Sequence, residues 1–247
     1  MTQEERTPTL RVLPSEVASR ALVVGDPQRV LSAAEYMQNV QEMGFFREYR
    51  TVTGEYAGKR ITISSHGVGS AGANICFHEL MGCNVQYIIR AGTCGAMQKG
   101  IRDGDTIIGT GAIREDGATE HMAPMAFPAV ADRRVTQALV TASHTFGVEN
   151  PHEGLVLTQA YFYPGILESE TDIWLKTGLV SCVEMEYATL LVMASLNKVS
   201  AGGIFTSDGN LTEEADPEAY DPHRKEVDEG KKNMLQIALK ALASLPD

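Results

Sequence analysis

The chain has 247 residues, 43% of them hydrophobic, and a formal net charge of −11 at pH 7. This length and apolar content suffice for one large α/β domain, so we predict a single domain over residues 1–247. The negative charge excludes generic binding to nucleic acids or anionic membranes, because no long-range positive field would attract them. An anionic ligand would therefore need a local cluster of arginines.

Cysteine and histidine spacing predicts no metal site. The four cysteines form no CxxC pair and are typical of buried, reduced thiols in a cytoplasmic protein. The six histidines likewise lack the spacing of metal ligands. The charged segment Thr2–Arg6 is unlike a signal peptide, and no apolar run approaches about 20 residues, so we expect no membrane association.

Apolar, β-branched runs alternate with helical patterns along the chain. Strands are predicted at residues 21–24, 51–56, 60–65, 87–89, 106–108, 154–157 and 201–205. Helices are predicted at residues 70–81, 131–146, 185–196 and 228–245. The segment 57–59 would connect the second and third strands as a hairpin. This alternation predicts an α/β sandwich around a mixed sheet.

The first motif is Gly25-Asp26-Pro27-Gln28-Arg29, directly after the first predicted strand. Gly25 would let the backbone approach a ligand, and Pro27 suits the first turn of a helix. The N–H groups of that helix start, together with Arg29, would form an anion pocket. An ordinary strand-to-helix turn with a surface arginine is the alternative.

The second motif is Arg90-Ala91-Gly92-Thr93-Cys94-Gly95. Arg90 follows an apolar strand, and a buried arginine is costly unless it is paired with an anion or a carboxylate. The glycines and Thr93 supply N–H groups and a hydroxyl beside it. A structural arginine bonded to Glu79 or to a helix end is the alternative.

Two further segments carry single carboxylates beside apolar runs. Glu184 and Glu186 flank Met185, and a carboxylate there would accept hydrogen bonds from two vicinal hydroxyls, as a ribose offers. A salt bridge and a helix N-terminal carboxylate would explain the same pair. Asp208 follows the strand at 203–205, where partial burial would raise its pKa and make it an acid; an Asp-Gly turn is the alternative.

Other segments near these motifs leave their roles open. The polar stretch 210–223 is either a lid over a site or an acidic solvated loop. Phe162 would either stack on a base or sugar or pack in the core. His66 lies beside a glycine turn, where a histidine is more often structural than catalytic.

Taken together, these segments resemble the nucleoside phosphorylase family of hexameric purine nucleoside phosphorylases and uridine phosphorylases. The resemblance spans nearly the whole chain and is greatest to purine nucleoside phosphorylases of apicomplexan parasites. It depends on Phe46-Arg47-Glu48-Tyr49, on residues 65–72 and on residues 88–95. It implies a three-layer α/β/α sandwich around a mixed, barrel-like sheet.

The resemblance also implies roles for individual residues. Phosphate would be bound by Gly25, Arg29, Arg90 and Thr93, with Arg47 contributed by a neighbouring subunit. The nucleoside would contact Phe162, Glu184, Met185, Glu186 and Asp208. Asp208 would be the catalytic residue, protonating N7 of a purine as phosphate attacks C1′ of the ribose. The implied protein is a homo-oligomer, expected to be a hexamer built from dimers that share Arg47, and it needs no cofactor beyond the co-substrate phosphate.

Two positions favour a purine over a pyrimidine. Uridine phosphorylases carry Gln-x-Arg after a Phe-Tyr-Pro-Gly segment, where this chain has Ile166-Leu167-Glu168, and they lack an aspartate at the position of Asp208. Two departures leave other questions open. Thr9 stands where purine phosphorylases of this group carry a histidine for the ribose 5′-hydroxyl, so 5′-modified nucleosides would be tolerated. Arg224 is the nearest candidate for the arginine that assists the catalytic aspartate in bacterial members.

Three alternatives to a purine nucleoside phosphorylase remain open on the sequence. One is a uridine or broad-specificity phosphorylase, and another is a hydrolytic nucleosidase of the same fold. A nucleosidase has no use for Arg29, Arg47 and Arg90 as a phosphate-binding set. The third is a catalytically silent nucleoside-binding protein, against which Asp208 and Glu186 argue.

Overall fold

The computed structural model describes residues 5–163, 165, 170–213 and 220–247. Their strands are β1 Arg20–Val24, β2 Gln38–Phe46, β3 Tyr49–Tyr56, β4 Lys59–Ser65, β5 Tyr87–Ala96, β6 Thr106–Glu115, β7 Ala129–Val130, β8 His152–Gln159, β9 Val180–Glu184 and β10 Ser200–Asn210. Their α-helices are α1 Pro27–Ala34, α2 Ser70–Gly82, α3 Arg133–Thr145, α4 Glu170–Thr177, α5 Tyr187–Asn197 and α6 Lys225–Ser244. Short 3₁₀ turns lie at Pro14–Glu16 and Thr119–His121.

One mixed sheet contains all of these strands, and part of it closes into a barrel. The strand order is β10-β6-β8-β9-β5-β1-β4-β3-β2, with β7 paired to β6. An additional pairing of β10 with β5 closes the ring β5-β10-β6-β8-β9. Strands β1, β4 and β5 run parallel, whereas β2, β3 and β4 form antiparallel hairpins. The predicted mixed, barrel-like sheet is thus confirmed.

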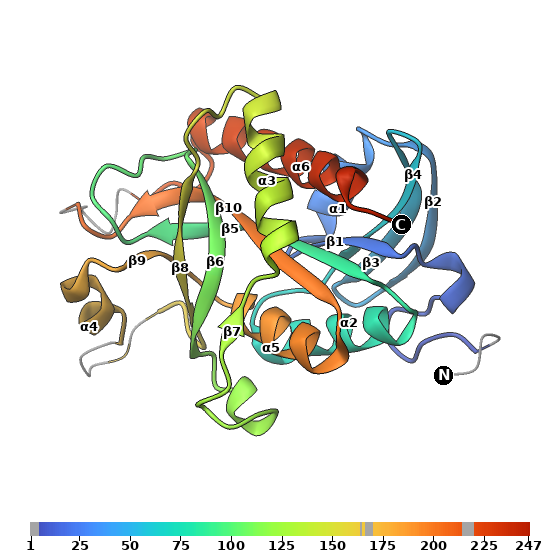
Figure 1. Ribbon diagram of the computed structural model, residues 1–247, viewed down its shortest axis with the longest axis horizontal. Helices are drawn as coiled ribbons and strands as arrows, with labels where there is room; N and C mark the ends of the chain where they lie inside the picture. Colours follow the sequence, from blue (N-terminus) through green and yellow to red (C-terminus); the bar gives the residue numbers. More distant parts are fainter. Residues whose placement is uncertain (1–4, 164, 166–169, 214–219) are drawn as a thin grey trace.

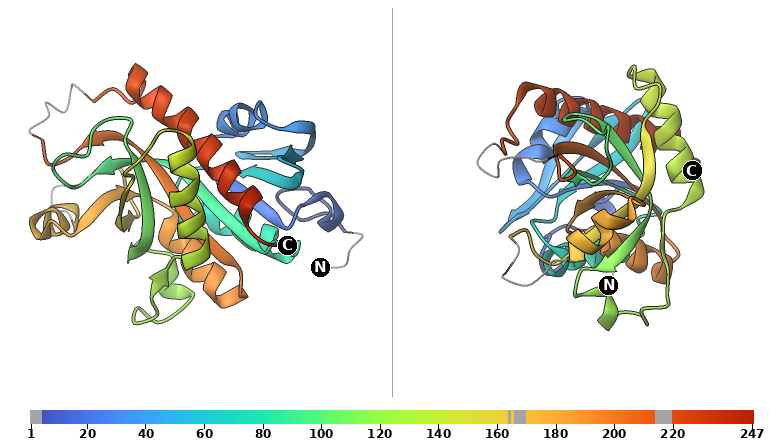
Figure 2. Two further views of the ribbon diagram at one scale, coloured as in Figure 1. Left: turned by 45° about the horizontal axis from the view of Figure 1, so that its top comes forward. Right: turned by 90° about the vertical axis from the view of Figure 1, so that its left-hand side faces the viewer.

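Helices cover both faces of the sheet, which makes the three layers that were predicted. Helices α1, α3 and α6 pack on one face around a core that includes Val30, Leu139 and Leu242. Helices α2 and α5 lie together on the other face, over a core that includes Phe77 and Leu190. Figure 1 shows α6 above the strands, α3 in front of them and α2 with α5 below them, and Figure 2 shows α3 and α6 crossing on the same side.

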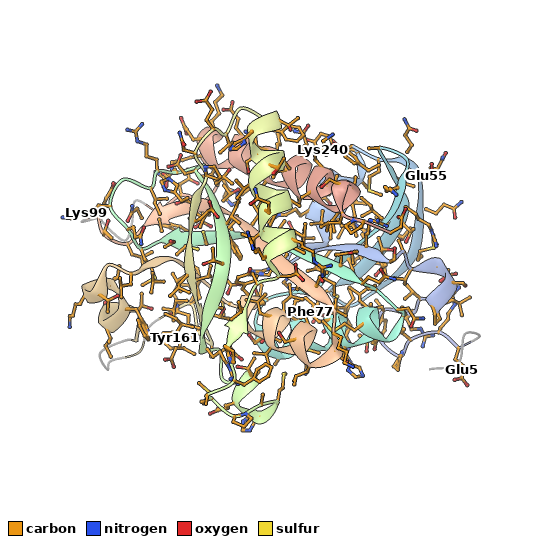
Figure 3. The ribbon with its side chains drawn as sticks, in the orientation of Figure 1. Glu5, Glu55, Phe77, Lys99, Tyr161 and Lys240 are labelled. Carbon is orange, nitrogen blue, oxygen red and sulfur yellow. The ribbon has the colours of Figure 1, made fainter. Side chains whose placement is uncertain are left out.

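The apolar pattern of each helix explains which layer it occupies. Helix α3 is amphipathic and buries Val135, Leu139 and Ala142 against the sheet while its other side stays in water. Helix α5 is apolar all round, and its first eight residues are buried. Side chains fill the space between the layers, as Figure 3 shows; Phe77, labelled there, is fully buried.

Candidate active site

The carboxyl ends of β1 and β4 meet at one edge of the sheet, where the first motif lies. The N–H of His66 donates to Val24 O at 2.9 Å, and the N–H of Gly67 donates to Gly25 O at 3.0 Å. Asp26 caps α1 by accepting a hydrogen bond from Gln28 N at 2.8 Å. The predicted turn from strand to helix after Gly25 is therefore confirmed, and it directs the N-terminus of α1 toward the edge where open α/β sheets bind ligands.

Arg29 lies in the first turn of α1 and is partly buried. Its guanidinium forms no hydrogen bond or ion pair with the residues that the structure describes. Burial lowers the pKa of Arg29, and the charge of nearby Arg90 lowers it further, while Asp26 opposes the change. Arg29 is thus a half-desolvated cation, and a bound anion would compensate it.

Arg90 lies in the middle of β5, at the level of Val23 in β1, and is 3% exposed. Its Nε donates to Glu184 Oε2 at 2.9 Å, and its Nη2 atom contacts both Glu184 and Glu186. A side chain at Gly92 would collide with the guanidinium, since its Cβ would lie 2.9 Å from Nη2. Burial alone would lower the pKa of Arg90, but Glu186 and Glu184 reverse this and raise it.

The alternative that Arg90 pairs with Glu79 is therefore wrong. The Glu79 carboxylate instead accepts hydrogen bonds from the N–H groups of Thr9 and Leu10, and so fastens the N-terminal segment to α2. Arg90 is paired with the carboxylates of the third motif, which lie 94 and 96 residues further along the chain.

His66 completes the surroundings of Arg90. It is fully buried, its Nε2 lies 2.8 Å from Arg90 Nη1, and its Nδ1 lies 2.8 Å from Gly67 O. Burial, and then the charge of Arg90, lower the pKa of His66 well below its usual value. A neutral imidazole with its proton on Nδ1 satisfies both contacts, because Nε2 then accepts from Arg90. The interpretation of His66 as a structural, hydrogen-bonded histidine fits this geometry.

Glu184 ends β9, and Glu186 directly precedes α5 without a side-chain hydrogen bond to the first turn of that helix. The Glu184 carboxylate accepts hydrogen bonds from the N–H groups of Glu186 and Tyr187 and from the hydroxyl of Thr158. It therefore anchors the first turn of α5 as well as Arg90, as carboxylates at helix N-termini do. Glu186 is 4% exposed, and burial raises its pKa while Arg90 opposes the rise.

Asp208 lies in β10, beside a register shift in the pairing of β10 with β5. It is 8% exposed, and Oδ2 accepts a hydrogen bond from the Tyr220 hydroxyl at 3.2 Å. Burial raises the pKa of Asp208, while the hydrogen bond from the Tyr220 hydroxyl opposes the rise. A carboxyl group with this environment holds a proton at higher pH than a solvated aspartate.

One cavity of about 1150 Å³ brings the motifs together. The predicted site residues that line it are Gly25, Arg29, Arg90, Thr93, Phe162, Glu184, Met185, Glu186 and Asp208. Strands and helix starts supply most of them, so the scaffold fixes their positions. Phe162 is the exception to this positioning by the scaffold. The residue is 57% exposed, and its ring contacts the rings of Tyr163 and Tyr220.

Arg47 is the predicted phosphate ligand that does not line this cavity. It lies in the tight turn between β2 and β3 with a φ of 56°, and its guanidinium lies 5.5 Å from the ring centre of Phe46. The neighbouring rings of Phe45 and Phe46 are 49% and 47% exposed. Within one chain, Arg47 therefore makes no contribution to the cavity.

Several residues that line the cavity were not predicted from the sequence. Tyr220, Asp103 and Gln159 line the cavity, yet each is an isolated residue with no motif around it. Arg224, the candidate to assist Asp208, lines the same cavity, and its Nη1 atom lies 2.5 Å from Asp103 Oδ2. An aromatic residue inside an acidic loop was the one available signal for Tyr220.

Two predictions fall wholly or partly on parts of the chain that the structure does not describe. The segment Ile166-Leu167-Glu168 lies outside the described residues, as do residues 214–219 of the loop 210–223. Among the described residues, no group of three or more His, Cys, Asp or Glu side chains could hold a metal ion. No helix in the same part of the chain is long and apolar enough to cross a membrane.

Comparison with known proteins identifies the class to which this fold and cavity belong. The sequence model of the phosphorylase superfamily matches residues 19–243, and the chain belongs to this family. It is 37% identical to the purine nucleoside phosphorylase of Plasmodium vivax over 238 residues, which cover 96% of this chain and 95% of the relative. It is 35% identical to the uridine phosphorylase of Klebsiella aerogenes over 215 residues, covering 82% and 84%.

A solved structure supports the same relationship. The crystal structure of Toxoplasma gondii purine nucleoside phosphorylase in complex with immucillin-H matches with a TM-score of 0.92 and 34% identity. The match covers 98% of this chain and 97% of that protein. The resemblance to nucleoside phosphorylases predicted from the sequence is thus confirmed.

Proposed function

We propose that this protein is a purine nucleoside phosphorylase, which converts a purine nucleoside and phosphate to free base and ribose 1-phosphate. The observation that carries the proposal is that one cavity is lined both by Arg29, a cation without a partner among the described residues, and by Asp208, a buried carboxyl. Phosphorolysis needs both groups, since an anion enters and a poor leaving group must be protonated.

The phosphate would bind at the start of α1. Its oxygens would accept hydrogen bonds from Arg29, from the backbone near Gly25 and from Thr93, with Arg90 behind them. Each charge-assisted hydrogen bond of this kind contributes about 1.5–3 kcal/mol. Since the Arg90 guanidinium already contacts two carboxylates and His66, we assign most of the phosphate affinity to Arg29.

The ribose would lie against Met185 and Glu186. Glu186 keeps acceptor capacity for the ribose hydroxyls because each carboxylate oxygen has two lone pairs and the protein supplies the donors of Gly69 and Arg90. Glu184 is saturated by protein donors, so we assign it to holding Arg90 and α5 instead of contacting the sugar. Phe162 would pack against the nucleoside.

Asp208 would act as the general acid. As phosphate oxygen bonds to C1′, the bond from C1′ to the purine breaks through an oxocarbenium-like state, and its electron pair goes to the base. The Asp208 proton then passes to N7, leaving a carboxylate. General acid catalysis of this kind contributes on the order of 10²–10⁴ in rate. The reaction needs no cofactor, because phosphate is itself the nucleophile.

Purine nucleosides are favoured over uridine by Asp208, which has no partner on a uracil leaving group, and by the lack of a Gln-x-Arg segment at residues 166–168. The higher coverage by the Plasmodium vivax enzyme than by the uridine phosphorylase agrees with this choice. We further propose a cytoplasmic hexamer active in purine salvage, built from dimers in which Arg47 completes the site of the neighbouring subunit.

Release of free base from inosine, adenosine and uridine, each with and without phosphate, tests the proposal. We expect phosphate-dependent cleavage of inosine or adenosine and little cleavage of uridine. Dominant cleavage of uridine would make the chain a uridine phosphorylase, and cleavage without phosphate would make it a nucleosidase.

The variant Asp208→Asn tests the chemical step. We expect kcat to fall on the order of 100-fold or more, while nucleoside binding measured by calorimetry changes by less than about threefold. If the wild-type protein and Asp208→Asn bind nucleoside equally and the wild-type protein shows no turnover, the protein is a silent nucleoside-binding protein instead.

A further inference from the structure

Tyr220 lies directly against the proposed acid. Its hydroxyl oxygen is 3.2 Å from Asp208 Oδ2. Its ring packs over Gly209, where an added Cβ would lie 3.4 Å from Cδ2 of the ring. On another side, the ring centre of Phe162 lies 6.3 Å away. Tyr220 is 44% exposed, and these contacts orient its ring so that the hydroxyl is directed at one oxygen of the Asp208 carboxyl.

The segment that follows Tyr220 is anchored to the body of the protein. Arg224 forms an ion pair with Asp103 at 2.5 Å, and its Nε donates to Asp221 O at 3.0 Å. Lys231 Nζ on α6 donates to Pro222 O at 2.8 Å. Because Arg224 is held by these contacts, the group that contacts Asp208 from this segment is a neutral phenol, whereas the sequence suggested a charged arginine.

The other groups that act on Asp208 come from three elements. Arg29 on α1 and Lys231 on α6 are cations that favour the carboxylate, and Cys94 on β5 is a buried thiol. Burial, followed by the charge of Asp208, raises the pKa of Tyr220, so the phenol keeps its proton at neutral pH. The neutral phenol therefore donates a hydrogen bond to Asp208. Because it is not a phenolate anion, it cannot accept the catalytic proton.

We propose that Tyr220 is a positioning residue for proton donation by Asp208, and this role rests on the proposed function above. By donating to Oδ2, the phenol leaves Oδ1 as the oxygen that carries the proton and faces the leaving base. During the reaction the O–H bond at Oδ1 breaks, an N–H bond forms on the base, and negative charge moves to the carboxylate. Tyr220 stabilises that charge without itself losing a proton.

The variant Tyr220→Phe tests this role, because it keeps the ring and its packing but removes the donor. We expect kcat for inosine at saturating phosphate to fall about three- to tenfold, the loss of one hydrogen bond, with KM changed less than about twofold. Activity requires protonated Asp208 and is lost as pH rises through its pKa. Removing a donor to the carboxylate raises that pKa, so the alkaline limb of the kcat profile should move up by about 0.5–1 pH unit.

Two controls separate this role from a structural one. Tyr56→Phe removes the same hydroxyl from β3, outside the cavity, and should leave kcat, KM and the pH profile as in the wild type. In an Asp208→Asn background, Tyr220→Phe should cause no further loss, because Tyr220 acts through Asp208.

Other outcomes would contradict this role of Tyr220. An alkaline limb that does not move, or a raised KM with unchanged kcat, would show that Tyr220 does not act through Asp208. A wild-type protein that releases no base from purine nucleosides would remove the proposed function and this role with it. Wild-type activity with an unshifted limb in Tyr220→Phe would remove the role of Tyr220 alone.

Discussion

Arg90 on β5 and Glu184 at the end of β9 form a hydrogen-bonded ion pair of 2.9 Å, with side chains only 4% and 1% exposed. The pair links the barrel to the first turn of α5, because the same carboxylate accepts the N–H groups of Glu186 and Tyr187. A charge removed from water at this depth must keep its partner, since leaving one member unpaired is strongly destabilising.

Replacing Glu184 with Gln should therefore reduce the free energy of unfolding by about 3–5 kcal/mol. The glutamine amide places a donor where two backbone N–H groups need an acceptor, and it leaves the charge of Arg90 only partly compensated. Urea unfolding followed by circular dichroism measures the change. Glu229→Gln, which breaks an exposed pair with Lys225 on α6, should change the same quantity by less than about 1 kcal/mol. Equal effects in the two variants would contradict the structural importance assigned to Glu184.

Replacing Arg29 with Gln should weaken phosphate binding more than nucleoside binding. Losing one or two charge-assisted hydrogen bonds corresponds to a rise of about 10-fold or more in the KM for phosphate. Steady-state kinetics at varied phosphate and at varied inosine measure both constants. The exposed Arg133→Gln on α3 is the matched control for loss of one positive charge and should leave both unchanged. An unaltered KM for phosphate in Arg29→Gln would place the anion elsewhere.

Mixing an Arg47→Ala protein with an Asp208→Asn protein should restore activity that neither variant has alone. If each site combines its own Asp208 with Arg47 of a neighbour, a mixed dimer holds one intact site of two. Random exchange at equal amounts should then give about a quarter of wild-type activity. Native mass spectrometry would verify that subunits exchange. Full exchange without recovered activity would show that Arg47 acts within its own chain or not at all.

Stability should fall on acidification in part because of His66. Its pKa is lowered in the folded protein, so below the unfolded value of about 6.5 the unfolded chain binds a proton that the folded chain does not. The contribution of His66 is therefore present above about pH 6.5 and decreases as pH falls, by up to about 1.4 kcal/mol per pH unit.

The variant His66→Gln isolates this contribution, since it cannot titrate. Unfolding free energies at pH 7.5 and pH 5.5 should differ less in the variant than in the wild type, even if the variant is less stable at both. The exposed His121→Gln should retain the wild-type difference. A pH dependence that is the same in all three proteins would show that His66 is not the group concerned.

Much of the fold follows from local patterns in the sequence. The apolar run at Ala21–Val24, the hairpin around Gly58 and the periodic helix that starts at Arg133 each appear where predicted, because their signals are short-range. Strands β5 and β10 extend beyond their predicted ends, since residues such as Thr93 and Ser207 are held by the pairing of these two strands and not by their own propensity. Strand β2 was missed because it is largely exposed and lacks a buried apolar face.

The sequence by itself determined the family and the residue types of the candidate site, because its motifs follow one another in a characteristic order along the chain. Tertiary structure decided which residues are partners. Pairing of β9 with β5 brings Glu184 to Arg90, an approach that no spacing in the sequence encodes. Anchoring of Arg224 by Asp103 leaves Tyr220 at Asp208. The Arg90–Glu184 and Asp103–Arg224 pairs join residues 94 and about 120 positions apart, and Tyr220 and Asp208 lie at the two ends of one loop, so only the folded chain brings these groups within hydrogen-bonding distance.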